Sequence, residues 1–347
     1  MRIFVYEFIT GGGTLGDDAA AANFAALAVE GRAMLEAVAS DFASLPGVEV
    51  TTLLDPRCEH VALGGVLTTT VSDATDHARQ FERLASAADR ALLIAPETDR
   101  HLLRLVQLAQ QYGCQLLGPD EDFIALAGDK HLLCEHLAAR EVPVPQGVAL
   151  TAGSRLPVGF PYPAVLKPRD GAGSQRMASV ASVDSSIALS SKVEARLEVF
   201  SPGLPVSVLL LCGPGCLTAL PPCQQFLSDE GRFTYRGGSL PIEPALTARA
   251  TDLASQAMAA LPAARGFVGV DLVLGDDPSG AGDVVIEVNP RLTTSYVGLR
   301  AALDCNLAAA CLAKLAGEDI DLPNPMPVEF APGGEIHRVD GTGRRSK

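Results

Sequence analysis

An apolar segment, VVIEVNPR at residues 284–291, carries side chains that could do chemistry. Alternation along a strand puts Glu287 and Asn289 on one face, and Ile286 and Val288 on the other. A carboxylate and an amide that share one face of an apolar strand are either solvated or hold a ligand. The segment therefore raises the question of what it binds.

The preceding segment, GFVGVDLVL, reads as the partner strand of a hairpin. If Leu274 lies opposite Val284, the register places Asp271 opposite Glu287. Facing carboxylates repel each other, and a divalent cation between them removes the repulsion. Together with the Asn289 oxygen they form the all-oxygen set that suits Mg²⁺, or Mn²⁺ in its place. The alternative is a solvated face with the register shifted by one residue, and the spacing does not decide between the two.

Lysine is rare in this chain, with five lysines among 27 Lys and Arg residues. Lys167 ends the apolar strand AVLKP, and Lys130 begins a helix after a possible cap at Asp129. A compact ammonium is a common partner for phosphate oxygens. For Lys130 an ordinary surface lysine is the alternative, and for Lys167 that alternative is weaker because the strand is otherwise apolar.

A short glycine-rich segment, RDGAGSQ, follows Lys167 directly. Glycines and a small hydroxyl allow backbone amides to close over phosphates. The four central residues are Gly171, Ala172, Gly173 and Ser174. Many β-turns have the same composition, so the segment gains weight only from its place after the lysine strand.

The first third of the chain alternates strand-like and helix-like segments, which predicts a parallel sheet with crossover connections. We expect a small open α/β domain that ends near Gly118. The expected strands are at residues 2–8, 48–54, 90–96 and 114–119, and the expected helices are at 19–40, 76–88 and 97–112.

The first loop of this domain, ITGGGTLG at residues 9–16, follows a strand and precedes a helix. A nucleotide-binding glycine loop has this place, but the GxGxxG spacing is not met. A tight strand-to-helix turn is favoured over a dinucleotide site. A small substrate could still bind to the amides of the turn.

The chain changes character from Asp120 onward. Two helices at residues 120–127 and 129–140 precede a proline-rich stretch, and a polar loop is expected at 226–239. Further helices are expected at 245–261, 294–300 and 306–315, with the two hairpin strands between the first two of these helices. The tail at 331–347 is polar and rich in glycine, so it is expected to be flexible.

The formal net charge of −14 argues against a nucleic acid or an anionic membrane as the main partner. An anionic ligand must then be held by a few local cations, amides or metal ions. No apolar run reaches the roughly 18 residues that a membrane span needs. The eight cysteines form no CxxC pair, which favours free thiols in a reducing cytoplasm.

Taken together, four segments resemble the ATP-grasp superfamily in order and spacing, over most of the chain. They are residues 129–145, 162–175, 197–208 and 269–291. The resemblance implies an N-terminal open α/β domain followed by a two-subdomain ATP-grasp fold. The implied divisions are a first domain at 1–118, an ATP-grasp subdomain with a lid loop at 119–200, a C-terminal subdomain with the metal site at 201–330, and the tail at 331–347.

The resemblance also implies roles for individual residues around ATP and Mg²⁺. Lys130 and Lys167 would contact the nucleotide phosphates, and residues 171–174 would form the mobile lid. Arg291 would stabilise the phosphoryl group in transfer, with Lys167 beside it. The implied hinge at the adenine is Glu198, Val199 and Phe200, and the implied metal ligands are Asp271, Glu287 and Asn289. Many members bind the ribose through an acidic residue where this chain has Pro205, which leaves ribose recognition open.

A narrower resemblance, carried by the first residues, GLPVSV, YRGGSLP and NPRLTTSYVGLR, is to tyramine–glutamate ligases of methanofuran-type cofactor synthesis. It implies a cytoplasmic carboxylate–amine ligase that forms an amide through an acyl phosphate. The carboxylate substrate would lie between residues 9–16 and 291–296, with Tyr235 and Arg236 as further candidate contacts. A phosphotransferase and a non-catalytic ATP-binding regulatory protein remain alternatives. The oligomeric state stays open, with a homodimer among the options.

Overall fold

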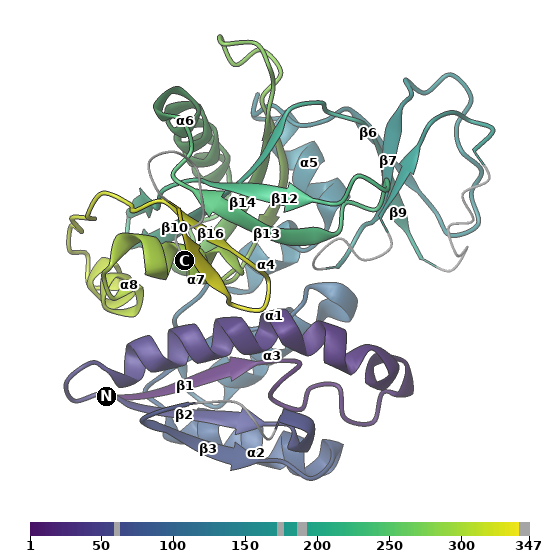
Figure 1. Cartoon of the computed structure of the whole chain (residues 1–347). Helices are drawn as coiled ribbons and strands as arrows, with labels where there is room; N and C mark the ends of the chain where they lie inside the picture. The colour runs from purple at the N-terminus through teal and green to yellow at the C-terminus, as the bar shows by residue number, and fades with distance from the viewer. Residues whose placement is uncertain (59–62, 172–176, 186–192, 340–347) are drawn as a thin grey trace.

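The structure is a computed structural model that describes residues 1–58, 63–171, 177–185 and 193–339, without the side chains of residues 18–23 (Figure 1). Three sheets organise these residues, with five, four and eight strands. The five-stranded sheet is parallel and comes first, and the other two are antiparallel, so the predicted mixture of α/β and α+β architecture is confirmed.

The parallel sheet has the strand order β3-β2-β1-β4-β5. Alternate side chains of β1 face opposite sides: Ile3 and Val5 pack with the first helix, whereas Phe4 and Tyr6 pack with the next two. Burial on both faces explains why the strands read as nearly continuous apolar runs. The elements are β1 (Arg2–Glu7), α1 (Asp18–Ala43), β2 (Glu49–Leu54), η1 (Pro56–Cys58), β3 (Val66–Thr70), α2 (Ala74–Ala87), β4 (Arg90–Ile94), η2 (Thr98–Arg100), α3 (His101–Gln111) and β5 (Gln115–Leu116).

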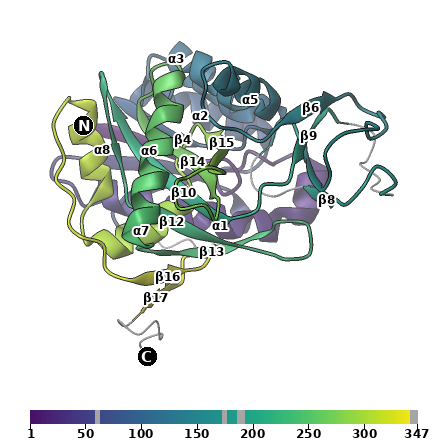
Figure 2. The same cartoon turned by 90° about the horizontal axis from the view of Figure 1, so that it is seen from above.

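Two helices and a small sheet follow. The helices are α4 (Glu121–Ala127) and α5 (Lys130–Ala138), and the sheet has the order β6-β9-β7-β8 with every pairing antiparallel. The strands are β6 (Gly147–Leu150), β7 (Ala164–Pro168), β8 (Ala178–Val180) and β9 (Ala195–Val199). Both cartoon views show this sheet set apart at one side of the molecule (Figures 1 and 2).

The large sheet has the order β15-β14-β10-β12-β13-β16-β17, and β11 pairs with β10 beside this path. Val208 of β10 faces a cluster formed with α4, α5 and α6, while Leu209 faces α7 and α8. The elements are β10 (Leu204–Gly213), β11 (Cys216–Ala219), β12 (Cys223–Leu227), β13 (Tyr235–Leu240), α6 (Pro244–Ala260), β14 (Gly266–Leu274), β15 (Val284–Asn289), α7 (Ser295–Leu303), α8 (Leu307–Leu315), β16 (Val328–Phe330) and β17 (Ile336–Arg338).

Three features differ from the expected elements. Strand β3 is absent from the predicted set, because VLTTT is a partly exposed edge strand without apolar alternation. The expected polar loop at 226–239 is wrong at both ends, since β12 and β13 pair with each other there. The expected flexible tail is wrong for residues 336–338, which pair with β16, while residues 340–347 lie outside the described part.

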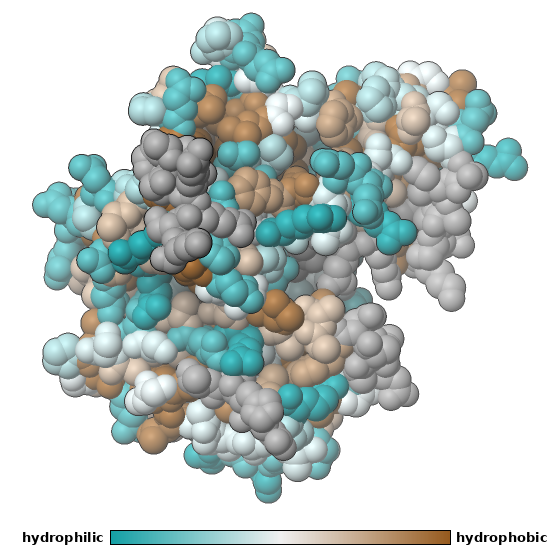
Figure 3. Space-filling model, in the orientation of Figure 1, coloured by the Kyte–Doolittle hydropathy of each residue, from teal (hydrophilic) through white to brown (hydrophobic). Residues whose placement is uncertain are grey.

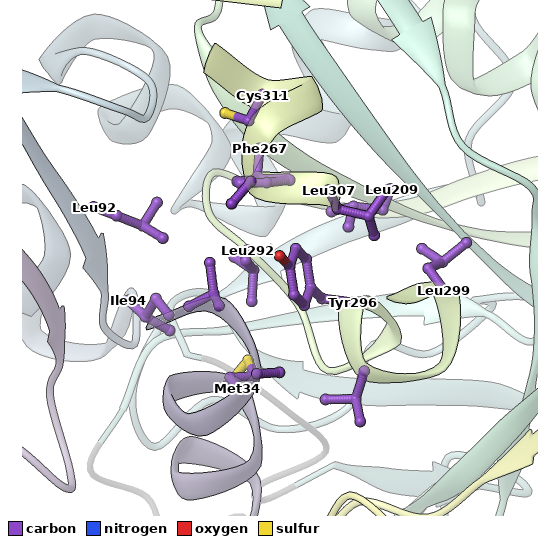
Figure 4. Close-up of a cluster of buried hydrophobic side chains, with 14 of the residues drawn as sticks. Met34, Leu92, Ile94, Leu209, Phe267, Leu292, Tyr296, Leu299, Leu307 and Cys311 are labelled. Atoms are coloured by element: carbon purple, nitrogen blue, oxygen red, sulfur yellow. The ribbon is translucent and has the colours of Figure 1, made fainter. Parts of the chain in front are cut away.

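One apolar cluster joins the parallel sheet to the large sheet, and we call it the junction core. Figure 4 shows Met34 of α1, Leu92 of β4, Leu209 of β10, Phe267 of β14 and Tyr296 of α7 pointing toward one another. The Phe267 and Tyr296 rings meet edge to face, with centroids 5.5 Å apart. The implied division at residue 118 is therefore crossed by a continuous core, and whether the divisions mark independent folding units stays a prediction.

The cysteines are all free thiols, as predicted. Burial raises the pKa of Cys212 to about 12 and that of Cys114 to about 11. A buried thiol that keeps its proton is a poor nucleophile and a poor metal ligand. The six buried cysteine side chains thus behave as small apolar groups, while Cys216 and Cys305 are partly exposed.

No single helix in the described ranges is long and apolar enough to cross a membrane. Helices α7 and α8 reach the required length and composition only as a pair, and they are bent by 99°. On the face seen in Figure 3, hydrophilic and hydrophobic residues are interspersed over the part that is not grey.

Candidate functional site

The hairpin of β14 and β15 places Asp271 opposite Glu287, as predicted. The pairing from which the prediction started is wrong by one residue, since Val284 lies opposite Val273 instead of Leu274. A β-bulge next to the carboxylate pair takes up the difference. The two acids are therefore cross-strand neighbours despite the shifted start.

The bulge also disturbs the alternation of β15. Val285 and Val288 both belong to the buried cluster with α6, whereas Ile286 lies outside that cluster and is half-buried. The expectation that Ile286 shares the face of Val288 is wrong for this reason. The Ile286 carbonyl instead accepts a hydrogen bond from Lys167 Nζ at 3.2 Å.

Lys130 is fixed by the start of α5. Asp129 caps the helix and pairs with Arg169, whose carbonyl accepts the Lys130 amide hydrogen at 2.8 Å. Lys130 Nζ lies 2.8 Å from Glu287 Oε2 and 2.8 Å from the Gly171 carbonyl oxygen. Its side chain is 9% exposed, so the surface-lysine alternative is wrong.

Lys167 is completely buried, and its partner is Glu198. Lys167 Nζ lies 2.6 Å from Glu198 Oε1, and Arg196 Nε donates to Glu198 Oε2 at 2.9 Å. Arg196 Nη1 also lies 3.0 Å from His131 Nδ1. One carboxylate thus serves two cations inside the small sheet, where an unpaired charge would be strongly unfavourable.

This pairing changes the expectation for the hinge. The Glu198 side chain is directed at Lys167 and Arg196, and so it is not turned toward a ligand at the hinge. The amides of Val199 and Phe200 donate to backbone carbonyls at 2.9 and 3.0 Å. Contact between this hinge and adenine stays a prediction.

Neutral donors hold the second carboxylate, Asp271. Gln225 Nε2 donates to Asp271 Oδ1 at 3.3 Å, and Asn289 Nδ2 donates to Asp271 Oδ2 at 3.1 Å. Burial and then the Glu287 charge raise the pKa of Asp271 to about 7. Burial also pushes the Glu287 pKa upward, but Lys130 and other cations outweigh it and the pKa lies below its ordinary value. The pKa values of the two facing acids are therefore shifted in opposite directions, and among the described residues Glu287 is the one with an ammonium in direct contact.

Arg291 reaches the parallel sheet. Its Nε donates to Glu97 Oε1 at 2.9 Å, and the two side chains are 10% and 5% exposed. Arg291 Nη2 also lies 3.5 Å from Asn289 Oδ1. Burial opposes the positive charge, but Glu97 and Glu287 hold the Arg291 pKa above its ordinary value.

Glu97 is a residue that the sequence reasoning missed. It follows β4, which lies beside β1 where the strand order reverses. Ligand sites of open parallel sheets lie at the carboxyl ends of the strands at such a reversal. Applied to the predicted strands, this rule would have singled out an acidic residue directly after the 90–96 strand.

The donor set of the hairpin fits a divalent cation. Asp271 and Glu287 face each other, and the Asn289 amide nitrogen donates to Asp271, so the amide group would have to turn over for its oxygen to join the carboxylate oxygens that hard cations require. Among the described residues, no group of three His, Cys, Asp or Glu side chains could hold a metal. Two carboxylates and the amide would therefore need water or phosphate oxygens to complete the set.

The three cations that were expected to contact phosphates all have acidic partners in the structure. Lys130 pairs with Glu287, Lys167 with Glu198 and Arg291 with Glu97. We call the group formed by Lys130, Lys167, Asp271, Glu287 and Arg291 the charged site. Because each of its cations already has an acidic partner, phosphates would have to compete for the cations.

The glycine loop at 9–16 is a tight turn, as favoured from the sequence. The amides of Gly11 and Gly13 donate to the carbonyls of Glu7 and Phe8, both at 2.8 Å. A Cβ at Gly11 would lie 2.5 Å from the Tyr6 ring, so close packing on the strand requires the glycine. These amides are committed within the turn and do not form a phosphate cradle.

Other predicted residues have different outcomes. Pro205 lies in β10 opposite Val273. Tyr235 begins β13, where burial and then the charges of Cys223, Glu30 and Asp271 raise its pKa well above the ordinary value. The predicted lid residues Ala172, Gly173 and Ser174 lie outside the described residues. Gly171 is described, with a φ of 129°, and it meets Lys130 through its carbonyl.

Comparison with known families agrees with this architecture. Residues 127–295 match the ATP-grasp domain, and residues 48–124 match the pre ATP-grasp 3 domain. The chain is an ATP-grasp domain protein.

Individual relatives are distant. A tyramine–L-glutamate ligase from Methanocaldococcus fervens is 28% identical over 213 residues, which are 61% of this chain and 62% of the relative. The chain therefore matches about three fifths of that relative's length.

Solved structures share the whole arrangement. An ATP-grasp superfamily protein from Archaeoglobus fulgidus is 25% identical with a TM-score of 0.71, and the match covers 95% of this chain and 92% of that one. An N5-carboxyaminoimidazole ribonucleotide synthetase in complex with ADP has a TM-score of 0.70 at 16% identity, over 95% of this chain and 81% of that one. The second likeness is one of fold alone.

Proposed function

We propose that this chain is an ATP-dependent carboxylate–amine ligase that forms an amide and releases ADP and phosphate. Membership of the ATP-grasp family supports nucleotide chemistry, and the likeness to tyramine–L-glutamate ligase supports an amino acid and an amine as substrates. Glutamate with tyramine, or a related amine, is the first pair to test.

One observation carries the proposal: charged groups from separate segments meet in one chain of contacts. Lys167 of β7 contacts the backbone of β15, and Lys130 of α5 contacts Glu287. Glu287 faces Asp271, and Asn289 links Asp271 to Arg291. A structural role alone does not need two facing acids, because such a pair weakens a sheet.

In the proposed reaction, an oxygen of the substrate carboxylate attacks the γ-phosphorus of ATP. The bond from that phosphorus to the bridging oxygen breaks, which gives an acyl phosphate and ADP. The amine nitrogen then attacks the acyl carbon, phosphate leaves with the C–O electron pair, and the nitrogen loses a proton to give the amide. Such transfers depend mainly on positioning and charge stabilisation.

The residues would divide this work. Lys130 and Lys167 would bind phosphate oxygens, and Arg291 would stabilise charge on the phosphoryl group in transfer. Asp271, Glu287 and Asn289 would hold Mg²⁺, which supplies charge neutralisation at phosphate oxygens when bound. Neither step needs a nucleophilic serine or cysteine.

The amino-acid substrate is proposed to lie between the glycine turn and the start of α7. Thr294 Oγ1 donates to Glu30 Oε2 at 3.1 Å there, and Thr293 and Ser295 share a hydrogen bond of 2.8 Å. Hydroxyl groups and the Arg291 guanidinium suit a carboxylate in this position.

The test is an ADP-release screen of the purified chain with ATP, Mg²⁺ and pairs of amino acids and amines. We expect ADP, phosphate and an amide in equal amounts with one pair, the amide being identified by mass spectrometry. Glu287→Gln and Asn289→Ala should fold and lose Mg²⁺-dependent turnover. Glu318→Gln, which removes the charge of an exposed acid in the segment after α8, is the matched control.

Other outcomes would contradict the proposal. A phosphorylated product without any need for an amine would indicate a phosphotransferase. ATP binding without ADP formation for any pair would indicate a non-catalytic nucleotide-binding protein. Full activity of Glu287→Gln would refute the metal assignment while leaving the ligase proposal open to other site residues.

A further inference from the structure

Backbone and side-chain contacts at the start of α5 hold Lys130 next to Glu287. Its backbone amide is bonded to the Arg169 carbonyl, and the Asp129 cap before it is held by the Arg169 side chain. Leu133 of the same helix is fully buried against the large sheet. These contacts hold the Lys130 ammonium beside Glu287, the carboxylate that is proposed to bind the metal.

The two facing carboxylates have different partners. Glu287 has the Lys130 ammonium at 2.8 Å, whereas Asp271 receives hydrogen bonds from the neutral amides of Gln225 and Asn289. Among the described residues, Lys130 is thus the cation in direct contact with the facing pair, through Glu287. It fills the electrostatic role that a divalent cation would otherwise fill.

Lys130 and a metal ion cannot share Glu287 freely. Mg²⁺ binds its oxygens at about 2.0–2.1 Å, so a metal on this carboxylate would lie within a few ångströms of the ammonium. Like charges at that separation repel strongly in a partly buried site. The ammonium has a second acceptor in the Gly171 carbonyl, so it stays partnered when it releases Glu287.

We propose that the Lys130 ammonium competes with a divalent cation for the Glu287 carboxylate. When nucleotide phosphates bind the ammonium, Lys130 leaves Glu287 and the cation takes its place. The inference rests on the proposed function, because it takes Asp271 and Glu287 as metal ligands. It adds that the chain binds divalent cations weakly without nucleotide and that ATP and metal enter together.

The test measures Mn²⁺ binding without nucleotide, using the electron paramagnetic resonance signal of free Mn²⁺. Lys130→Met keeps the length of the side chain and removes its charge. We expect Mn²⁺ to bind this variant at least about tenfold more tightly than the wild type, which is within the ordinary range of coupling between sites. Adding ATP should increase Mn²⁺ affinity more in the wild type than in the variant.

Two controls separate competition from a general charge effect. Lys167→Met removes a second buried ammonium near β15, which pairs with Glu198, and should change Mn²⁺ affinity far less. Lys130→Arg keeps the positive charge and should bind Mn²⁺ as weakly as the wild type. If Lys130→Met does not give a folded protein by circular dichroism, Lys130→Gln serves as the uncharged variant.

Equal Mn²⁺ affinity of the wild type and the uncharged Lys130 variant would overturn the competition. An equal gain from Lys167→Met would overturn it too, because the effect would then not be specific to Glu287. If the competition fails while the wild type binds Mn²⁺ with ATP and turns over, the proposed function stands. If Mn²⁺ binds no form of the chain even with ATP, the metal assignment and this inference fall together.

Discussion

The large sheet is held to its neighbours in two regions by opposite means. In the junction core, apolar side chains of α1, β4, α7 and α8 close against β10 and β14 (Figure 4). In the charged site, α5, β7 and the Glu97 turn meet β15 and Arg291 through ion pairs and hydrogen bonds. The chain thus combines an interface packed with apolar side chains and an interface held by ion pairs and hydrogen bonds.

The comparison shows which of the two kinds of contact a bound ligand can replace with contacts of its own. Close-packed apolar groups gain stability only from remaining in contact, and no small ligand can replace them without leaving a cavity. An ammonium or a guanidinium, in contrast, can pass from a carboxylate to a phosphate without losing a charged partner. The junction core therefore fixes the frame, and the charged site is where binding can act.

The largest expected effect comes from the junction core. Phe267 is fully buried and meets the Tyr296 ring edge to face. Phe267→Ala should lower the free energy of unfolding by about 3–5 kcal/mol, because lost transfer energy and a new cavity add together. Denaturant unfolding followed by circular dichroism measures this change.

The control for this variant is Leu217→Ala, which shortens a side chain that is 37% exposed on β11. Its unfolding free energy should change by less than about 1 kcal/mol, as is usual for surface sites. If the two substitutions destabilise the chain equally, the junction core is not the rigid part of the frame. ATP binding by the folded Phe267→Ala protein should remain close to that of the wild type.

The next largest effect is expected from Glu97, which follows β4 of the parallel sheet and holds Arg291 of the charged site. Glu97→Gln keeps the shape of the side chain but removes the charge that holds Arg291. Turnover should fall by up to about 100-fold, since a misplacement of about 1 Å has that consequence, while the KM for ATP changes by less than about threefold. Steady-state kinetics over ATP and substrate concentrations separates the two parameters.

If Glu97 acts by positioning Arg291, two further results are expected. Glu121→Gln, which alters an acid that bonds with Gln107 on α3, should keep normal kinetics. Combining Glu97→Gln with Arg291→Lys should add little to the loss from Arg291→Lys alone, because both changes disturb the same guanidinium. Fully additive losses would mean that Glu97 acts independently of Arg291.

Much of the fold could be predicted because its segments are locally consistent. The nearly continuous apolar runs of β1 and β4, and the cap at Asp129, give the strands and helix starts directly. Strand β3 could not be found this way, because its stability comes from pairing with β2 and not from its own apolar pattern. The pairing of Asp271 with Glu287 was correct although a bulge changed the register elsewhere.

The charged site was predicted less completely, because sequence spacing does not show which charges pair across the fold. Lys167 and Glu198 are drawn together by the pairing of β7 with β9, which no local pattern reveals. The same holds for Glu97 and Arg291, which are 194 positions apart in the chain. The ligand contacts of these residues stay predictions.

The smallest expected effect sharpens the comparison, because it concerns a polar contact beside the junction core. Tyr296 Oη donates to Asp41 Oδ2 at 2.6 Å, and Arg300 Nε donates to Asp41 Oδ1 at 2.6 Å. Tyr296→Phe should lower the free energy of unfolding by about 1–1.5 kcal/mol near neutral pH. The loss stays modest because Arg300 continues to pair with the acid.

The pH dependence of this variant distinguishes the hydroxyl from the ring. Burial and then the Asp41 charge hold the Tyr296 pKa well above its ordinary value, whereas the unfolded phenol ionises near pH 10. The stability that this group contributes is therefore fully present below about pH 10 and is lost as the pH rises further. Unfolding measured at about pH 8 and about pH 11 should show the difference between wild type and Tyr296→Phe shrinking, because the wild type loses stability that the variant never had. A difference that stays constant with pH would mean that the hydroxyl contributes through packing and not through its retained proton.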